Sequence, residues 1–453
     1  MRRVLAALAA SLALASCGSD ECSVGKANQF VHQNTLDWYL YPELLPDPLP
    51  DPARYADPQD LLDALTANAR AAGMDRGWSY VASYSAVTAY YAGGPTAGFG
   101  FSLQIRGTGQ LFLTQVMTGS AAAAGGFHRG DEILSISDVT GILAQTPFTS
   151  ESISAAIGPA TAGVTRTFEV APVEGGTATR TVTKAAYTLV PVSHAVIDRG
   201  VGVPKIGYVN LVTFITPAEA QLREAFAAFQ ADGVQDVIVD LRYNGGGLVD
   251  TAIVLANLLG GGRTTNDTMF AWYLNPAHLA DTPPPQTFAP EAGSISVRRV
   301  AFVTTGASAS ASELVANVME PWVPVAIVGA RTYGKPVGQR GFVLQSCDLL
   351  LGLIAFGLEN AQGDGAYFDG LPDAGGNFSG PLCAAADDLT LPMGNPLEAS
   401  TAAALAFVDT GACPAPVAAA PALRTSLLRT SAGAVNPTAA DPTPAQRDVA
   451  GLF

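Results

Sequence analysis

Between residues 186 and 413 the sequence alternates short apolar runs with amphipathic segments. The runs VPKIGYVNLVTF, VQDVIVDLRYNGGG and RRVAFVTT are rich in β-branched residues, which is typical of buried strands. AEAQLREAFAAFQADG and TAIVLANLLGG have the spacing of helices. Parallel strands need helical crossovers of this kind, so the pattern predicts an α/β fold with a largely parallel sheet.

Length and composition limit the number of domains and the kinds of partner that the chain can have. With 453 residues the chain is too long for one ordinary domain, and its 48% apolar content is sufficient for real cores. Residues 26–92 are predicted to be mainly helical, because PQDLLDALTANARAAG has apolar side chains at helical spacing. The net charge of −15 argues against nucleic acid as a partner, since phosphate binding needs basic patches.

Residues 93–185 change to glycine-rich and alternating patterns. AGFGFSLQI and QLFLTQVM predict strands, and SAAAAGGFHRGDEILSISD predicts a short helix, a turn and a strand. This order resembles a PDZ domain. The resemblance implies that Gly98, Phe99, Gly100 and Phe101 form the loop whose backbone N–H groups bind a peptide carboxylate. The two phenylalanines suggest a preference for an apolar C-terminal side chain.

The first residues have the features of an export signal. Arg2 and Arg3 precede a short apolar run that ends in small residues before Cys17, so residues 1–16 are interpreted as a signal peptide and 17–25 as a tether. The position of Cys17 resembles the bacterial lipobox, which implies a lipidated N-terminus and membrane anchoring in the cell envelope. Gly18 in place of an aspartate favours the outer membrane, facing the periplasm or the cell surface. The alternative is an ordinary signal peptide with a chance cysteine.

Export places the remaining cysteines in an oxidising compartment. Cys22, Cys347, Cys383 and Cys413 allow three pairings, among which the sequence cannot choose. We expect Cys347–Cys383 with Cys22–Cys413, because the second pair would join the two ends of the folded body. The cysteine and histidine spacing suggests no metal site, and we expect no cofactor.

The Ala/Pro-rich residues 414–453 are predicted to be a disordered tail. The tail ends in DVAGLF, whose apolar terminus resembles a PDZ ligand. This end could occupy the PDZ groove of the same molecule or of a neighbour and restrain activity.

The segment TTGASASASELVANVM carries Ser308, Ser310 and Ser312 at alternate positions before an apolar helical run. A serine at a helix N-terminus lies in a positive field and beside outward-pointing N–H groups, which suits a nucleophile, although Ala/Ser alternation can also be filler. The four histidines, His32, His128, His194 and His278, form no recognisable triad motif. Buried lysine can replace histidine as the base, and the candidate is Lys335 in VGARTYGKPVGQ. A surface lysine after a turn is the alternative.

The motifs DLRYNGGG, ASASE and RTYGKPVGQ occur in this order, each after a strand-like run. From about residue 30 to 410 the chain resembles the S41 peptidases, which include the C-terminal processing and tail-specific proteases. The resemblance implies a crotonase-like protease core over residues 186–413, with Ser310 as nucleophile, Lys335 as general base 25 residues later, and Gln339 orienting the base. It also implies an oxyanion hole from the N–H groups of Ala311 and of Gly246 or Gly245.

The sequence departs from the family pattern in two places. Pro336 replaces the glycine that commonly follows the lysine, and Pro321, next to Glu320, stands where some members have an acidic residue that supports activity. Neither change removes Ser310 or Lys335. Three residues of the DLRYN segment are interpreted as structural supports of the glycine loop: Asp240, Arg242 and Asn244.

These observations predict a serine endopeptidase that cleaves exported proteins or peptides and recognises apolar C-termini through its PDZ domain. The alternative is a non-catalytic, peptide-binding lipoprotein with an inert protease-like core. The lipase-type GxSxG and penicillin-binding-type SxxK motifs are both missing around Ser310, which argues against those other serine hydrolases.

Overall fold

The computed structural model describes residues 21–93, 95–415 and 434–435. Its central sheet has the strand order β10-β11-β12-β15-β16-β19. β10 is antiparallel to β11, and each of the following pairs is parallel. The strands are β10 (Val192–Ile197), β11 (Ile206–Leu211), β12 (Asp236–Asp240), β15 (Arg299–Thr304), β16 (Val325–Gly329) and β19 (Leu382–Ala384).

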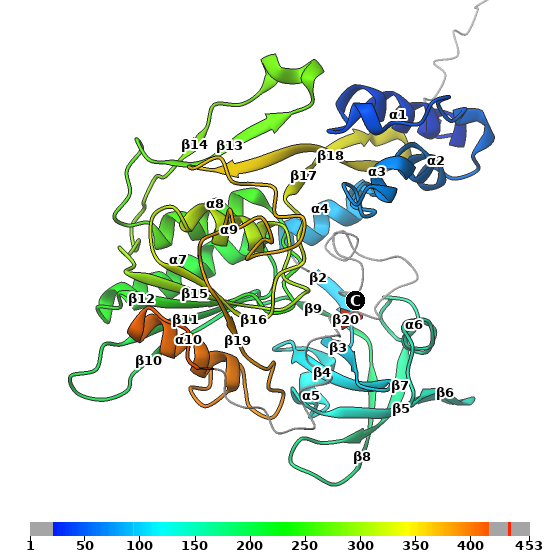
Figure 1. The fold of residues 1–453 in the computed structure, drawn as a ribbon. Coiled ribbons are helices and arrows are strands. Elements are labelled where there is room, and N and C mark those ends of the chain that lie inside the picture. Colours follow the sequence, from blue (N-terminus) through cyan, green and yellow to red (C-terminus); the bar gives the residue numbers. More distant parts are fainter. Residues whose placement is uncertain (1–20, 94, 416–433, 436–453) are drawn as a thin grey trace, which may run out of the picture.

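Helices cover both faces of this sheet (Figure 1). α7, α8 and α9 pack on one face, where Val237 and Val239 of β12 point. α10 packs on the other face, against Ile238. The helices are α7 (Thr216–Ala231), α8 (Val249–Leu259), α9 (Ala311–Met319) and α10 (Ala399–Thr410). The predicted α/β core is confirmed. Its inner strands β11, β12, β15 and β16 are mostly apolar because both of their faces are buried, whereas the edge strands β10 and β19 are partly exposed.

A second, antiparallel sheet joins the core to the N-terminal helices. Its order is β1-β18-β13-β14, with β17 also paired to β18. The β17–β18 hairpin packs on the N-terminal apolar cluster through Val337, Leu351 and Leu353. The elements are β1 (Tyr80–Ser83), β13 (Thr268–Leu274), η3 (Pro276–Asp281), β14 (Gln286–Thr287), β17 (Val337–Leu344), η4 (Gln345–Cys347) and β18 (Leu349–Asn360).

The N-terminal region is helical, as expected, apart from β1. Ser23 caps the first helix by accepting a hydrogen bond from the Lys26 N–H. The elements are α1 (Val24–Trp38), η1 (Pro42–Leu44), η2 (Pro52–Arg54), α2 (Pro58–Leu65), α3 (Ala67–Ala71) and α4 (Tyr84–Gly93).

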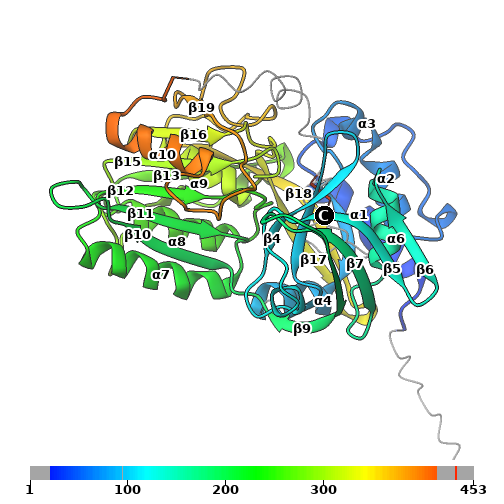
Figure 2. The same cartoon turned by 90° about the horizontal axis from the view of Figure 1, so that it is seen from below.

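The PDZ part forms its own sheet, in the order β20-β3-β4-β5-β7-β8 with β6 on β5, and a separate β2–β9 pair. Figures 1 and 2 place it beside the central sheet. β20, from the far C-terminal part of the chain, pairs antiparallel with β3. The elements are β2 (Pro95–Gly98), β3 (Phe101–Arg106), β4 (Gln110–Val116), α5 (Ala121–Ala124), β5 (Glu132–Asp138), β6 (Gly141–Gln145), α6 (Ser150–Ile157), β7 (Thr165–Ala171), β8 (Ala178–Thr183), β9 (Ala185–Thr188) and β20 (Ala434–Val435).

The disulfides are Cys22–Cys347 and Cys383–Cys413. The expected pairing, Cys347–Cys383 with Cys22–Cys413, is therefore wrong. The β17–β18 hairpin runs away from the central sheet and brings its turn to the start of α1, where Cys22 lies. Cys383 stays in β19 on the sheet edge, next to the end of α10 and Cys413.

The predicted signal segment and Cys17 lie outside the described residues, as does DVAGLF at the chain end. Within the part of the chain that the structure describes, every helix falls short of the length or hydrophobicity needed to cross a membrane.

Candidate active site

Ser310 lies at the turn from β15 into α9, with backbone angles φ 55° and ψ −117°. A residue other than glycine rarely adopts a positive φ, so the surrounding contacts must hold this strained backbone conformation. One of these contacts is the Ser310 N–H, which donates to Glu313 Oε2 at 2.8 Å. Ser310 is partly exposed at the positive end of a nine-residue helix.

The two neighbouring serines are buried and serve as anchors. Ser308 Oγ donates to the Leu241 carbonyl at 2.7 Å, and Ser312 Oγ donates to the Asn244 carbonyl at 2.9 Å. Both carbonyls belong to the DLRYNGGG loop after β12. Of the three serines, Ser310 alone is partly exposed.

The glycine loop packs directly against the Ser310 turn. A β-carbon at Gly246, which has φ 108°, would lie 2.8 Å from Ser310 Cβ and 3.0 Å from the Ala311 nitrogen, so only glycine fits. Asn244 forms the loop as predicted: its amide donates to the Leu211 carbonyl and its Oδ1 accepts the Gly246 N–H at 2.9 Å. The Gly246 N–H is thus engaged within the loop, while the adjacent Gly245 is partly exposed.

Lys335 lies in the turn between β16 and β17 and is 1% exposed. Its Nζ is 6.0 Å from the ring centre of Trp78, which belongs to the N-terminal region. Gln339, on β17, donates from Nε2 to the Trp78 carbonyl at 3.0 Å. Gln339 and Lys335 therefore contact the same tryptophan from neighbouring positions.

The fully buried Glu313 carboxylate joins the Ser310 turn to the Lys335 turn. Its Oε2 accepts the N–H groups of Ser310 and Lys335, each at 2.8 Å, so these two nitrogens are at most about twice that distance apart. Its Oε1 accepts the Gly334 N–H at 2.7 Å and Thr332 Oγ1 at 2.5 Å. Burial raises the pKa of Glu313, and the hydrogen bonds act in the opposite direction.

Asp240 and Arg242 form a buried ion-pair network below the glycine loop. Arg242, 1% exposed, contacts Asp240, Asp387 and Glu398. This agrees with the structural role predicted for the first two residues. Glu398 also caps α10 by accepting the N–H groups of Ser400 and Thr401.

The same network reaches the PDZ part, which the sequence did not predict. Arg106 and Arg129, from the PDZ side, both contact Asp387, and Arg129 donates to Tyr243 Oη at 2.9 Å. Tyr243 precedes the glycine loop and has φ 63°. Nothing in the local sequence around Asp387, AAADDLTLP, distinguishes this aspartate from an ordinary loop residue.

The predicted carboxylate loop of the PDZ part is built around Gly100, which has φ 83°. A β-carbon there would lie 2.0 Å from Ser120 Cβ. Phe99 and Phe101 are 1% and 4% exposed, and their rings pack on each other and on Phe168 in the PDZ core. Both rings therefore form part of the PDZ core.

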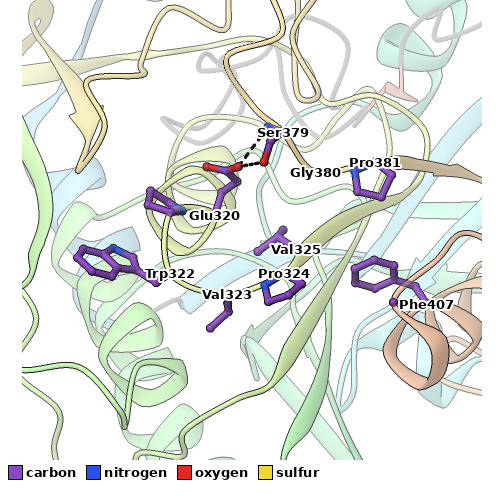
Figure 3. Close-up of a pocket in the computed structure, with 11 residues that line it drawn as sticks. Glu320, Trp322, Val323, Pro324, Val325, Ser379, Gly380, Pro381 and Phe407 are labelled. Atoms are coloured by element: carbon purple, nitrogen blue, oxygen red, sulfur yellow. Dashed lines mark hydrogen bonds between the residues drawn. The ribbon is translucent and has the colours of Figure 1, made fainter.

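A separate pocket of about 390 Å³ lies at the opposite end of α9 (Figure 3). Glu320 and Pro321 line it together with Trp322, and Glu320 Oε1 accepts the Ser379 N–H at 3.2 Å. The departure from the family pattern at Pro321 thus lies at the end of the helix remote from Ser310. Neither Ser310 nor Lys335 lines this pocket.

Among the residues that the structure describes, one group of side chains has metal-ligand spacing: His128, Asp131 and Glu174. Asp131 already accepts the His128 and Val173 N–H groups and pairs with Arg180. Because its carboxylate is occupied and the other two side chains are exposed, this group is an ordinary surface ion-pair cluster.

Replacing Glu313 with glutamine tests whether its carboxylate holds the Ser310 turn and the Lys335 turn together. One of its oxygens becomes an NH₂ group that faces donors, so we expect the free energy of unfolding to fall by about 1–3 kcal/mol. Urea unfolding of Glu313→Gln measures this loss. Glu320→Gln, at the other end of α9, is the matched control. An equal loss of stability in the two variants would contradict this role of Glu313.

The network at Asp387 predicts a pH dependence. Desolvation raises the pKa of Asp387, but Arg129, Arg242 and Arg106 outweigh it and lower the pKa to about 2. A lowered pKa means that the stabilisation is complete above the usual value of 3.8 and is lost as the pH falls toward 2.

We therefore expect Asp387→Asn to lower the urea midpoint at pH 7, with a difference from the wild type that shrinks between pH 4 and pH 2. Asp369→Asn, at an exposed site, controls for general loss of charge. A difference that does not change over this pH range would contradict the assignment.

Comparison with known proteins gives three matches to family models. Residues 205–364 match peptidase family S41, residues 26–80 match the peptidase S41 N-terminal domain, and residues 92–145 match the PDZ domain. An S41 protease structure from Bacteroides fragilis is similar, with a TM-score of 0.66 and 25% identity, over 84% of this chain and 97% of that one.

Two curated relatives are proteases that process carboxyl termini. The carboxyl-terminal-processing protease of Synechocystis sp. is 26% identical over 55% of this chain and 56% of its own length. The chloroplastic carboxyl-terminal-processing peptidase 1 of Arabidopsis thaliana is 27% identical over 53% of this chain and 46% of its own length. The chain thus spans about half the length of the curated relatives it matches. By these matches it carries an S41 peptidase domain together with an S41 N-terminal domain and a PDZ domain.

Proposed function

We propose that the protein is a serine endopeptidase in which Ser310 is the nucleophile and Lys335 the general base. The observation that carries this proposal is the single Glu313 oxygen that accepts both the Ser310 and the Lys335 N–H groups. It brings a strained serine at a helix N-terminus next to a buried lysine. Burial is the environment in which lysine serves as a base.

The proposed mechanism uses these groups in turn. Neutral Lys335 takes the proton of Ser310 Oγ, which attacks the peptide carbonyl carbon. The N–H of Ala311, at the start of α9, receives the developing oxyanion. The glycine loop supplies the second donor, from Gly245 or from Gly246 after it releases Asn244 Oδ1. The lysine returns its proton to the leaving amine, and water then hydrolyses the acyl-enzyme.

The PDZ part would deliver the substrate. The edge of β3 that does not pair with β4 accepts an added strand: Ala434–Val435 (β20) pairs there with Gln104 and Leu103, which supports this use of the edge. The loop Gly98–Phe101 would bind the peptide carboxylate through backbone N–H groups. We propose protein or peptide substrates with apolar C-termini.

The proposed location is the cell envelope, with Cys17 as a lipid anchor in the outer membrane. Two disulfides within the described residues support an oxidising compartment. Labelling with a radioactive fatty acid, compared between wild type and Cys17→Ala, tests the anchor.

Cleavage of fluorescein-labelled casein by the chain lacking residues 1–17 tests the mechanism. We expect Ser310→Ala and Lys335→Ala each to lower the rate by at least ~10³-fold with unchanged circular dichroism, since nucleophile and base act as a unit. Ser346→Ala, the same substitution at an exposed position outside the site, is the control, and we expect it to retain most activity. Wild-type protein that binds peptide but cleaves nothing would favour the non-catalytic alternative.

The C-terminal tail is proposed to compete for the PDZ groove. The segment that pairs with β3 is Ala434–Val435, whereas the predicted segment, residues 448–453, lies outside the described residues. Deleting residues 414–453 keeps Cys413, and we expect this to tighten binding of a fluorescent peptide with an apolar C-terminus several-fold.

The double variant Ala434→Pro, Val435→Pro should tighten binding to the same extent, because proline cannot complete a β-ladder. Ala422→Pro, elsewhere in the tail, is the control. Fluorescence anisotropy measures the affinities, and an unchanged value after the deletion would contradict competition by the tail.

A further inference from the structure

The Lys335 turn is held from two sides by different parts of the chain. On the core side, Glu313 accepts the N–H groups of Gly334 and Lys335. On the other side, the loop Asp75–Ser79 of the N-terminal region contacts the same turn. The family resemblance assigned no role to this loop, and its side chains are not among those that the mechanism uses.

Arg76 holds the backbone of the turn. Its guanidinium donates to the Gly334 carbonyl and, at 2.8 Å, to the Phe368 carbonyl. The guanidinium carbon lies 4.8 Å from the Trp78 ring centre and 4.7 Å from that of Tyr333. A planar, delocalised cation suits this arrangement, in which it contacts two aromatic rings and also bonds two carbonyls.

Trp78 forms the wall beside the lysine side chain. It is fully buried, its ring centre is 6.0 Å from Lys335 Nζ, and its carbonyl accepts the Gln339 amide. The ring also makes an edge contact with Tyr333 at 6.2 Å. One residue of the N-terminal region therefore contacts both the proposed base and the residue expected to orient it.

The loop itself is rigidly anchored. The buried Asp75 carboxylate accepts the N–H groups of Trp78 and Ser79, the Ser79 hydroxyl and, at 3.0 Å, the Tyr39 hydroxyl. Ser79 Oγ in turn accepts the Ile354 N–H of β18. The indole is thus fixed to the sheet that also carries β17, which begins two residues after Lys335.

We propose that Arg76 and Trp78 are positioning residues for Lys335, with Arg76 fixing the turn backbone and Trp78 keeping water from the amine. This rests on the proposed function, in which Lys335 is the base. Besides Lys335 and Arg76, the charged group at this turn is Glu313, and the other titratable side chain is Tyr333. Arg331 and Asp369, in the adjoining segments, are exposed.

The test is the pH–rate profile of casein cleavage by the chain lacking residues 1–17. Trp78→Leu removes the aromatic wall beside Lys335 Nζ, so water, which solvates ammonium ions better than neutral amines, can reach this position. We therefore expect kcat to fall about tenfold or more at pH 7 and much less at pH 9, with KM nearly unchanged. Trp78→Phe keeps an aromatic wall and should restore the wild-type profile. Trp38→Leu, in the same region but stacked on His278, is the control for general destabilisation.

Arg76→Gln provides a second variant at a partly exposed site, in case Trp78→Leu does not fold. It should lower kcat while KM and the unfolding temperature change little. The proposal is overturned if Trp78→Leu keeps the shape of the wild-type profile and Arg76→Gln keeps the wild-type kcat, or if both variants lose activity only in proportion to folded protein. Full activity of Ser310→Ala would instead overturn the proposed function, which keeps the two failures distinct.

Discussion

A buried carboxylate that is fully hydrogen-bonded is the constraint on which the Ser310–Lys335 arrangement depends. Burying a charge without partners costs many kcal/mol, so Glu313 is tolerated only with its donors in place. Those donors are the backbone of Ser310, the backbone of the Lys335 turn and the Thr332 hydroxyl. One carboxylate therefore fixes both the strained φ of Ser310 and the tight turn at Gly334.

The parallel sheet explains why these segments meet. The glycine loop follows β12, Ser310 follows β15 and the Lys335 turn follows β16, which are adjacent strands in the sheet. The carboxyl ends of parallel strands lie at one edge, where sites of α/β proteins usually form. The alternating apolar runs predicted the fold class, whereas the grouping of Ser310, Lys335 and Gly246 was an expectation from the family resemblance. The positions of the three motifs, each after one of these adjacent strands, agree with that expectation.

Features that depend on distant contacts could not be predicted in this way. The disulfide pairing was wrong because the direction of the β17–β18 hairpin is set by its packing on the N-terminal helices, not by the local pattern at Cys347. The packing of Phe99 and Phe101 into the PDZ core was not predicted either, since a glycine-flanked aromatic residue has the same sequence pattern whether its ring lines a groove or lies in a core. The sequence around Asp387 gives no indication of its structural role, because this role depends on three arginines that lie far from it in the sequence.

These long-range contacts mean that each half of the site is supported by a different domain. Tyr243, beside the glycine loop, bonds to Arg129 of the PDZ part, while the Lys335 turn bonds to Arg76 of the N-terminal region. A loop with positive φ values and a buried lysine turn are both costly to hold in place, and the core alone supplies only one side of each. The geometry around Ser310 therefore depends on all three parts of the chain, and damage to either flanking domain should disturb the site without touching Ser310 itself.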